Sequence, residues 1–173
     1  MLPENRKKIR MVYIAGPIDG ISREAAQNWR TEAYDTLAQM GIVSAVPGLE
    51  KTKMKSGQIV RLDENMIHSA DAILVNLTYL ANPPTKWMGT GTLVELGMGL
   101  AYRKLIIAFT EGGELDENFL FLRGTYDHYF SSMKEALEKI REINEPYVWK
   151  NLQKAKKLSL KLSKEIKKSL KPL

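Results

Sequence analysis

The sequence has 173 residues, of which 44% are hydrophobic and none is cysteine. This length accommodates one compact domain with an appendage, and the lack of cysteine excludes disulfides, thiolate zinc sites and cysteine nucleophiles. Since His68 and His128 are the only histidines, we expect no metal site. The N-terminus has no signal-peptide pattern and no stretch approaches the ~20 apolar residues of a membrane span, which predicts a cytoplasmic protein.

The net charge of +6 is unevenly distributed. Residues 147–173 contain nine lysines and one glutamate, a local charge of +8, which leaves 17 basic and 19 acidic residues before them. The body of the protein is therefore nearly neutral. Any attraction to a polyanion belongs to the last 27 residues.

Strand and helix patterns alternate along the first 70 residues. A β-branched and aromatic run ends in Gly16-Pro17, and the segment after it places apolar side chains at helical spacing up to Gly41. In chain order the patterns predict a strand at 10–15, a helix at 23–40, a strand at 42–46, a polar loop to residue 57 and a short helix around 59–69.

The alternation continues in the second half. Residues 72–77 and 104–109 are almost continuously apolar, as in strands that are buried on both faces. A Pro-rich loop and a helix at 92–102 lie between them, and a helix at 131–143 follows, with Ser131 or Ser132 as its cap and Met133, Leu137 and Ile140 on one face. The fold class is therefore α/β, with a parallel sheet of about five strands covered by helices on both faces. We place the domain at 1–145 and an appendage at 146–173.

Ligands of open parallel sheets bind in the loops after the carboxyl ends of the strands. These are the loops at 16–22, 47–58, 78–92 and 110–118. The first contains Gly16 and Asp19 but lacks the GxGxxG pattern, and no GxxxxGK[ST] occurs, so ATP or dinucleotide binding has little support. Its backbone can still approach a small sugar closely.

Glu95 has two interpretations. Thr92-Leu93-Val94-Glu95 fits the capping box, in which a glutamate satisfies a backbone donor at the start of a helix, and spacing alone favours this interpretation. In the other interpretation, the helix dipole keeps the carboxylate ionised as a nucleophile that faces the strand ends. One side chain in one rotamer cannot do both.

Two further carboxylates and a histidine precede the strand at 72–77. Asp71 precedes the strand and is interpreted as a turn or cap residue, and His68 as a packing or surface residue. Asp63 has a helical surface position as its default. Cleavage of a glycosidic bond nevertheless needs a second carboxyl group beside the nucleophile, and the fold could bring Asp63 to Glu95.

Three motifs in this order resemble the nucleoside 2-deoxyribosyltransferase family over residues 11–143. They are YIAGP at 13–17, the Asp63 helix that ends in SAD before a strand, and GTLVELGMGLAYRKLIIAF at 91–109. The resemblance implies a flavodoxin-like sheet, a homo-oligomer and a double displacement that needs no cofactor or metal. It implies Glu95 as nucleophile, Tyr13 as the residue that orients it, Asp63 as the residue that contacts or protonates the base, and Asn118 as a sugar contact lent by a neighbouring subunit.

The sequence also departs from the family pattern. Transferases often have a base-binding Asp six residues before the nucleophile, where this chain has Gly89; Gly91 and Thr92 complete the predicted substrate-binding set. Related nucleoside 5′-monophosphate N-glycosidases hold phosphate with hydroxyl and basic residues in the first loop, where this chain has Pro17 and Asp19. We predict a transferase, with such a hydrolase as the alternative and a non-catalytic nucleotide-binding sensor as an alternative of another class.

The appendage has the pattern of a basic amphipathic helix. Apolar residues recur every three or four positions with lysines between them, at Leu152, Ala155, Leu158, Leu162, Ile166 and Leu170. Three interpretations stay open: packing on the domain or on another subunit, binding to an anionic membrane surface, or contact with nucleic acid or another partner.

Overall fold

The computed structural model describes residues 8–18, 21–47, 54–81, 89–112, 115 and 120–145. The predicted appendage helix at 146–173 and the candidate site residues Asp19 and Asn118 lie outside this range. The strands are β1 (Met11–Ala15), β2 (Val43–Ala45), β3 (Ala72–Asn76), β4 (Leu105–Phe109) and β5 (His128–Phe130), and the helices are α1 (Arg23–Gln39), α2 (Ser56–Ser69), α3 (Thr78–Ala81), α4 (Thr90–Ala101), α5 (Leu120–Arg123) and α6 (Met133–Asn144).

The five strands form one parallel sheet in the order β2-β1-β3-β4-β5. This is the order of flavodoxin-like folds, in which the chain reverses its direction of winding between β1 and β3. Tyr13 lies in the middle of β1, opposite Ala45 of β2 and Ile73 of β3. The α/β, flavodoxin-like prediction is therefore confirmed.

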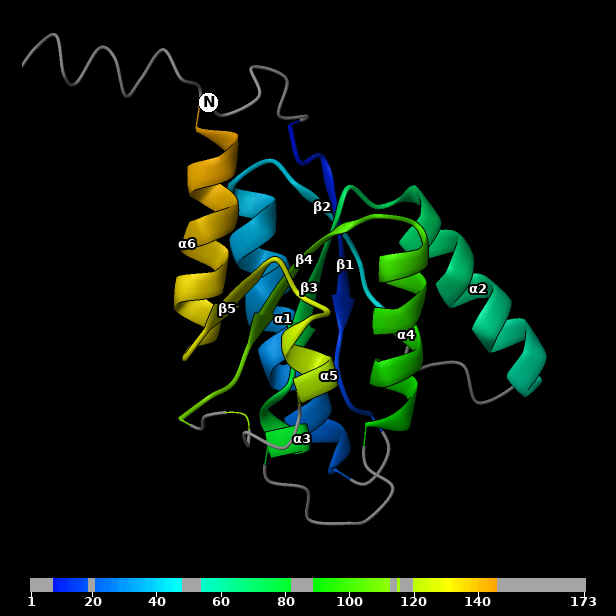
Figure 1. Cartoon of the computed structure of the whole chain (residues 1–173). Coiled ribbons are helices and arrows are strands. Elements are labelled where there is room, and N and C mark those ends of the chain that lie inside the picture. The colour runs from blue at the N-terminus through cyan, green and yellow to red at the C-terminus, as the bar shows by residue number, and fades with distance from the viewer. Residues whose placement is uncertain are drawn as a thin grey trace, which may run out of the picture.

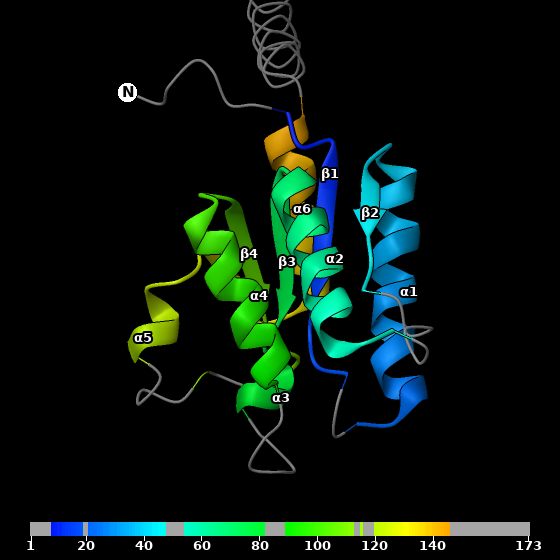
Figure 2. The ribbon, with the colours of Figure 1, turned by 90° about the vertical axis from the view of Figure 1, so that its right-hand side faces the viewer.

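Helices cover both faces of the sheet, with α1 and α6 on one side and α2 and α4 on the other (Figures 1 and 2). Each face has its own hydrophobic cluster: Leu37 and Ile140 belong to the first, and Ile67 and Leu96 to the second. All five residues of β3 are buried, which explains why four of them, Ala72 to Val75, are apolar. On the second face, a Cβ atom at Gly99 would lie 2.4 Å from Ile73 Cδ1, so this glycine lets α4 approach the sheet.

The structure adds three elements that the sequence patterns did not locate. They are α3, α5 and β5, which have four, four and three residues. Elements this short contain less than two periods of any hydrophobic repeat, so periodicity cannot reveal them. In addition, α2 begins at Ser56, three residues before its predicted start, because its first turn is polar and exposed.

Two residues at the ends of elements have structural roles: the predicted cap Ser132 is confirmed, whereas Asp71 bonds to another strand and not within its own turn. Asp71 Oδ2 accepts hydrogen bonds from the backbone N–H groups of Arg10 and Met11, at 2.8 and 3.1 Å, and so ties the start of β1 to the turn before β3. Ser132 caps α6, because its Oγ accepts from Glu135 N at 3.3 Å. Among the described residues, no helix is long and apolar enough to cross a membrane.

Candidate active site

Tyr13 and Glu95 meet between β1 and α4. The Tyr13 side chain is completely buried in the hydrophobic cluster beneath α2 and α4, and its hydroxyl donates a hydrogen bond of 2.6 Å to Glu95 Oε1. A bond this short between a phenol and a carboxylate is typical of a charge-assisted hydrogen bond. It joins residues 82 positions apart in the sequence and fixes the orientation of the carboxylate.

The start of α4 rules out the capping-box interpretation of Glu95. The cap residue is Gly89, the helix begins at Thr90, and Glu95 is its sixth residue, beyond the turn whose backbone donors a cap satisfies. Thr92, the expected cap, lies inside the helix and is 2% exposed. Because residues three apart share a helix face, Thr92 and Glu95 both face the sheet.

Gly89 adopts a backbone conformation that explains why a larger residue is absent. Its φ of +81° lies in the left-handed region, which residues with a Cβ atom rarely adopt. A Cβ atom there would lie 2.7 Å from Leu80 Cδ2. An Asp at this position would therefore need both the backbone and Leu80 to move.

Asp63 lies within electrostatic reach of the Tyr13–Glu95 pair. Burial is the main reason that the pKa of the Tyr13 hydroxyl is raised far above its usual value, and the charge and hydrogen bond of Glu95 raise it further. The charge of Asp63, on α2, adds to this increase in pKa. The fold thus gathers the three predicted catalytic residues from β1, α2 and α4, and Tyr13 stays protonated as a donor at neutral pH.

A buried cation that the sequence patterns missed lies beneath the first loop. Arg30, on α1, is 2% exposed, and its Nη2 donates to Gly16 O while its Nη1 donates to Pro17 O and Ala26 O, at 2.5, 3.3 and 2.5 Å. Burial lowers the pKa of its guanidinium to about 10, against the opposing effects of Glu95 and Tyr13. It therefore remains charged at neutral pH and offsets part of the negative charge of the site.

Trp29 and Gly16 complete this anchor. The guanidinium carbon of Arg30 lies 4.6 Å from the centre of the Trp29 ring, a cation–π distance. A Cβ atom at position 16 would lie 2.5 Å from Trp29 Cζ2, so only glycine lets the end of β1 pass this ring. The sequence signal for Arg30 was its spacing, because it shares the buried stripe of α1 with Ala26, Ala33 and Leu37.

Of the remaining described residues that the sequence singled out, Thr92 lies beside the site, and Gly91 and His68 are exposed. Thr92 is buried on the Glu95 side of α4, and its Oγ1 has no hydrogen-bond partner among the described residues, whereas Gly91 is exposed. His68 is exposed and stacks edge-on against Tyr102 at 5.0 Å, as expected of a packing residue. No group of three or more His, Asp or Glu side chains within the described ranges could hold a metal ion.

The chain was compared with known proteins. The sequence model described as "Nucleoside 2-deoxyribosyltransferase" matches residues 12–121, and no curated protein matches the chain. Similar solved structures include a 2-deoxyribosyltransferase from Leishmania mexicana (TM-score 0.60, 21% identity, 77% of this chain and 97% of that one). The others are BlsM (0.58, 21%, 82% and 98%) and the CMP N-glycosidase BcmB of Clostridium botulinum (0.51, 20%, 76% and 97%). At these identities the likeness shows the fold.

Proposed function

The chain belongs to the nucleoside 2-deoxyribosyltransferase family, and we propose that it cleaves the N-glycosidic bond of a (deoxy)nucleoside and passes the sugar to another base. The observation that carries this proposal is the hydrogen bond from the buried Tyr13 side chain to Glu95 Oε1. A carboxylate fixed in this way is a nucleophile aligned before the substrate arrives, which lowers the entropic cost of attack.

The proposed reaction is a double displacement. A Glu95 oxygen attacks C1′ of the sugar, the C1′–N bond breaks, and its electron pair leaves with the base, which receives a proton from the Asp63 carboxyl. The nitrogen of a second base then attacks C1′ of the covalent glycosyl-Glu95 and gives its proton to the Asp63 carboxylate, and the Glu95 carboxylate leaves. Two inversions at C1′ retain the configuration. Asp63 on α2 lies close enough to the pair to raise the Tyr13 pKa, which supports its place beside the leaving base.

The other groups around the pair act on substrate position. We infer that the buried Thr92 hydroxyl contacts the sugar, because it has the same orientation as Glu95 and no partner among the described residues. Arg30 is a positioning residue: it holds the carbonyls of Gly16 and Pro17 and places a positive charge behind the carboxylates. Asp19 and Asn118 remain proposed substrate contacts.

One observation favours hydrolysis of a nucleoside or its 5′-monophosphate as the second candidate. The left-handed backbone of Gly89 and the proximity of Leu80 disfavour a carboxylate at position 89 that would bind the acceptor base. An enzyme without that contact can still transfer the sugar to water. One of the similar structures is described as a CMP N-glycosidase, which is consistent with this alternative.

We also propose a homo-oligomer that is assembled through α2 and α4. The outer surface of α4 exposes Leu93, Val94 and Leu100, by 40, 54 and 42%, and the nearby α2 exposes Val60 and Leu62. A helix that is apolar on all sides is normally buried, and we propose that a second copy of the chain packs against this face. Such a partner would lie next to Glu95 and could lend a residue to the site.

Product analysis distinguishes the candidates. The protein is incubated with a deoxynucleoside, with and without a second free base, and with the corresponding monophosphate, and the products are separated by chromatography. A new nucleoside that forms only with the acceptor base supports transfer, whereas free sugar or sugar phosphate supports hydrolysis. Glu95→Gln should abolish either activity. If wild type and Glu95→Gln are equally inert with all substrates, the enzyme proposal fails and the nucleotide-binding sensor takes its place.

A further inference from the structure

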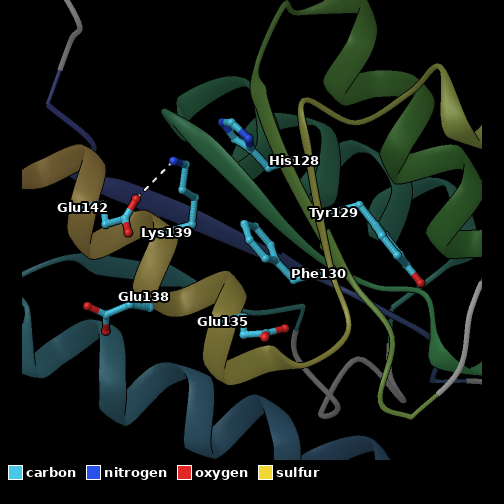
Figure 3. A pocket seen from close by; sticks show the side chains of 7 residues that line it. All are labelled: His128, Tyr129, Phe130, Glu135, Glu138, Lys139 and Glu142. Atoms are coloured by element: carbon cyan, nitrogen blue, oxygen red, sulfur yellow. Dashed lines mark hydrogen bonds and ion pairs between the residues drawn. The ribbon is translucent and has the colours of Figure 1, made fainter.

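A hollow of about 520 Å³ lies between β5 and α6. Figure 3 shows its lining: His128 and Phe130 come from the edge strand, and four charged side chains project from successive turns of α6. Glu95 is on α4, which covers the opposite face of the sheet, so this hollow is separate from the candidate active site.

The lining of the hollow is acidic. Glu135, Glu138 and Glu142 face a single cation of the lining, Lys139. Lys139 pairs with Glu142 at 3.1 Å, and Arg141 pairs with Glu138. Both ion pairs are between neighbouring turns and their side chains are 28 to 53% exposed, and ion pairs at the surface contribute little to stability. A cationic ligand could therefore displace them at small cost.

The sheet ends beside this hollow. In the described part of the chain β5 is an outermost strand and pairs with β4. The free side of an edge strand presents unpaired backbone groups, and proteins commonly cover such an edge with a helix or a loop. A segment that covers this edge and fills the hollow should therefore carry positive charges and have an apolar side.

The chain itself continues from the end of α6. Asn144, the last residue of that helix, is fixed by two hydrogen bonds of 2.8 Å to the backbone of Ile9. Glu145 leaves the helical conformation with a ψ of 124°, as expected before Pro146, because proline disfavours a helical residue in front of it. Glu145, the last described residue, thus ends α6 about one helical turn beyond Glu142.

The sequence that follows has the two properties that the hollow requires. Residues 147–173 carry nine lysines and one glutamate, and their leucines recur at helical spacing. As a helix, residues 152–166 would be about 22 Å long, and the 12 residues of α6 span about 18 Å. The segment is therefore long enough to lie along α6, its charge is opposite to that of the hollow, and it begins where α6 ends.

We propose that residues 147–173 turn back at Pro146 and lie as a helix in the hollow between β5 and α6. The apolar side formed by Leu152, Leu158 and Leu162 packs toward Phe130, and the flanking lysines pair with Glu135, Glu138 and Glu142. This segment covers the edge of the sheet within the same chain. It leaves the Glu95 site open.

Cross-linking tests the proposal cleanly, because the chain contains no cysteine. Glu138→Cys is combined in separate full-length proteins with Lys154→Cys, Lys157→Cys or Lys161→Cys, and a short thiol cross-linker is added to dilute protein. Matched controls carry the same tail cysteines with Arg61→Cys, an exposed residue of α2 on the opposite face. We expect a cross-link within one chain for at least one Glu138→Cys protein, at a yield at least about tenfold above its control.

A second measurement tests the charge contribution. Glu135→Lys and Glu142→Lys are added to the best cross-linking protein. They should lower the cross-linking yield about three- to tenfold, because each replaces a weak attraction between a glutamate and a tail lysine by a repulsion. Circular dichroism verifies that each protein is folded. Yields equal to the controls, or products that join two chains, would overturn the proposal; in the second case the segment covers another copy.

Discussion

Replacing Tyr13 by phenylalanine tests the central contact of the site. The substitution removes the hydroxyl that donates to Glu95 Oε1 at 2.6 Å and leaves the aromatic ring in its buried position. Hydrogen bonds to charged groups contribute about 1.5–3 kcal/mol, and each 1.36 kcal/mol corresponds to about a tenfold change in rate. We therefore expect kcat/KM for nucleoside cleavage to fall about 10- to 100-fold.

The pH dependence gives a second readout. Without its donor the ionised carboxylate is less stabilised, so the acidic limb of the pH profile of kcat/KM should move to higher pH. A general loss of structure would lower the rate at all pH values and would leave this limb in place.

A matched control exists in the same molecule. Tyr102 donates to Glu64 Oε1, also at 2.6 Å, but this pair is outside the candidate site. Tyr102→Phe makes the same chemical change and should leave kcat/KM within about twofold of wild type. If Tyr13→Phe has no larger effect than Tyr102→Phe, the proposed role of Tyr13 in orienting Glu95 is refuted.

Four other predictions concern stability and assembly. Gly89→Ala should lower the free energy of unfolding in urea by about 1 kcal/mol or more, because φ is +81° and Leu80 is close; an unchanged midpoint would argue against this backbone conformation. Arg30→Lys should cost about 1–3 kcal/mol, since one ammonium group cannot serve three carbonyls in a fork; a loss below about 0.5 kcal/mol would contradict this. The pKa of the Tyr13 hydroxyl is raised in the folded protein, so the stability that folding gains by keeping this hydroxyl protonated is complete below about pH 10 and is lost as the pH rises further. The free energy of unfolding of Tyr13→Phe should therefore fall less than that of wild type between pH 9 and about 11. Val94→Asp, on the exposed side of α4, should produce monomers in light scattering, whereas Val43→Asp on β2 should not; equal masses for both would count against the α4 interface.

The alternating order of strands and helices was predictable because it depends on local periodicity. The run at 72–77 and the stripe of α6 have patterns that sheet and helix geometry require, and Ser132 caps its helix through its neighbour Glu135. Such features need only a few adjacent residues. The fifth strand at His128–Phe130 was not located, because three residues have no periodicity and an edge strand is held by the sheet to which it binds.

The site was predictable only in part. Tyr13, Asp63 and Glu95 were selected through the family resemblance, while the spacing of Thr92 and Glu95 pointed to a cap. The start of α4 at Thr90 contradicts the cap, and this start depends on the left-handed turn at Gly89, which the sequence does not display. A buried role for Arg30 was not predicted, because charged residues of helices are usually exposed.

By itself the sequence determined the α/β pattern, the boundary between a nearly neutral body and a basic segment, and the residue types available for chemistry. These follow from composition and from contacts between residues near one another in the chain. Only the tertiary structure decided that Tyr13 donates to Glu95 and that a buried Arg30 lies beneath the first loop. The reason is physical: a hydrogen bond between residues 82 positions apart, and the burial of a charge, exist only when strand pairing and helix packing bring distant segments together.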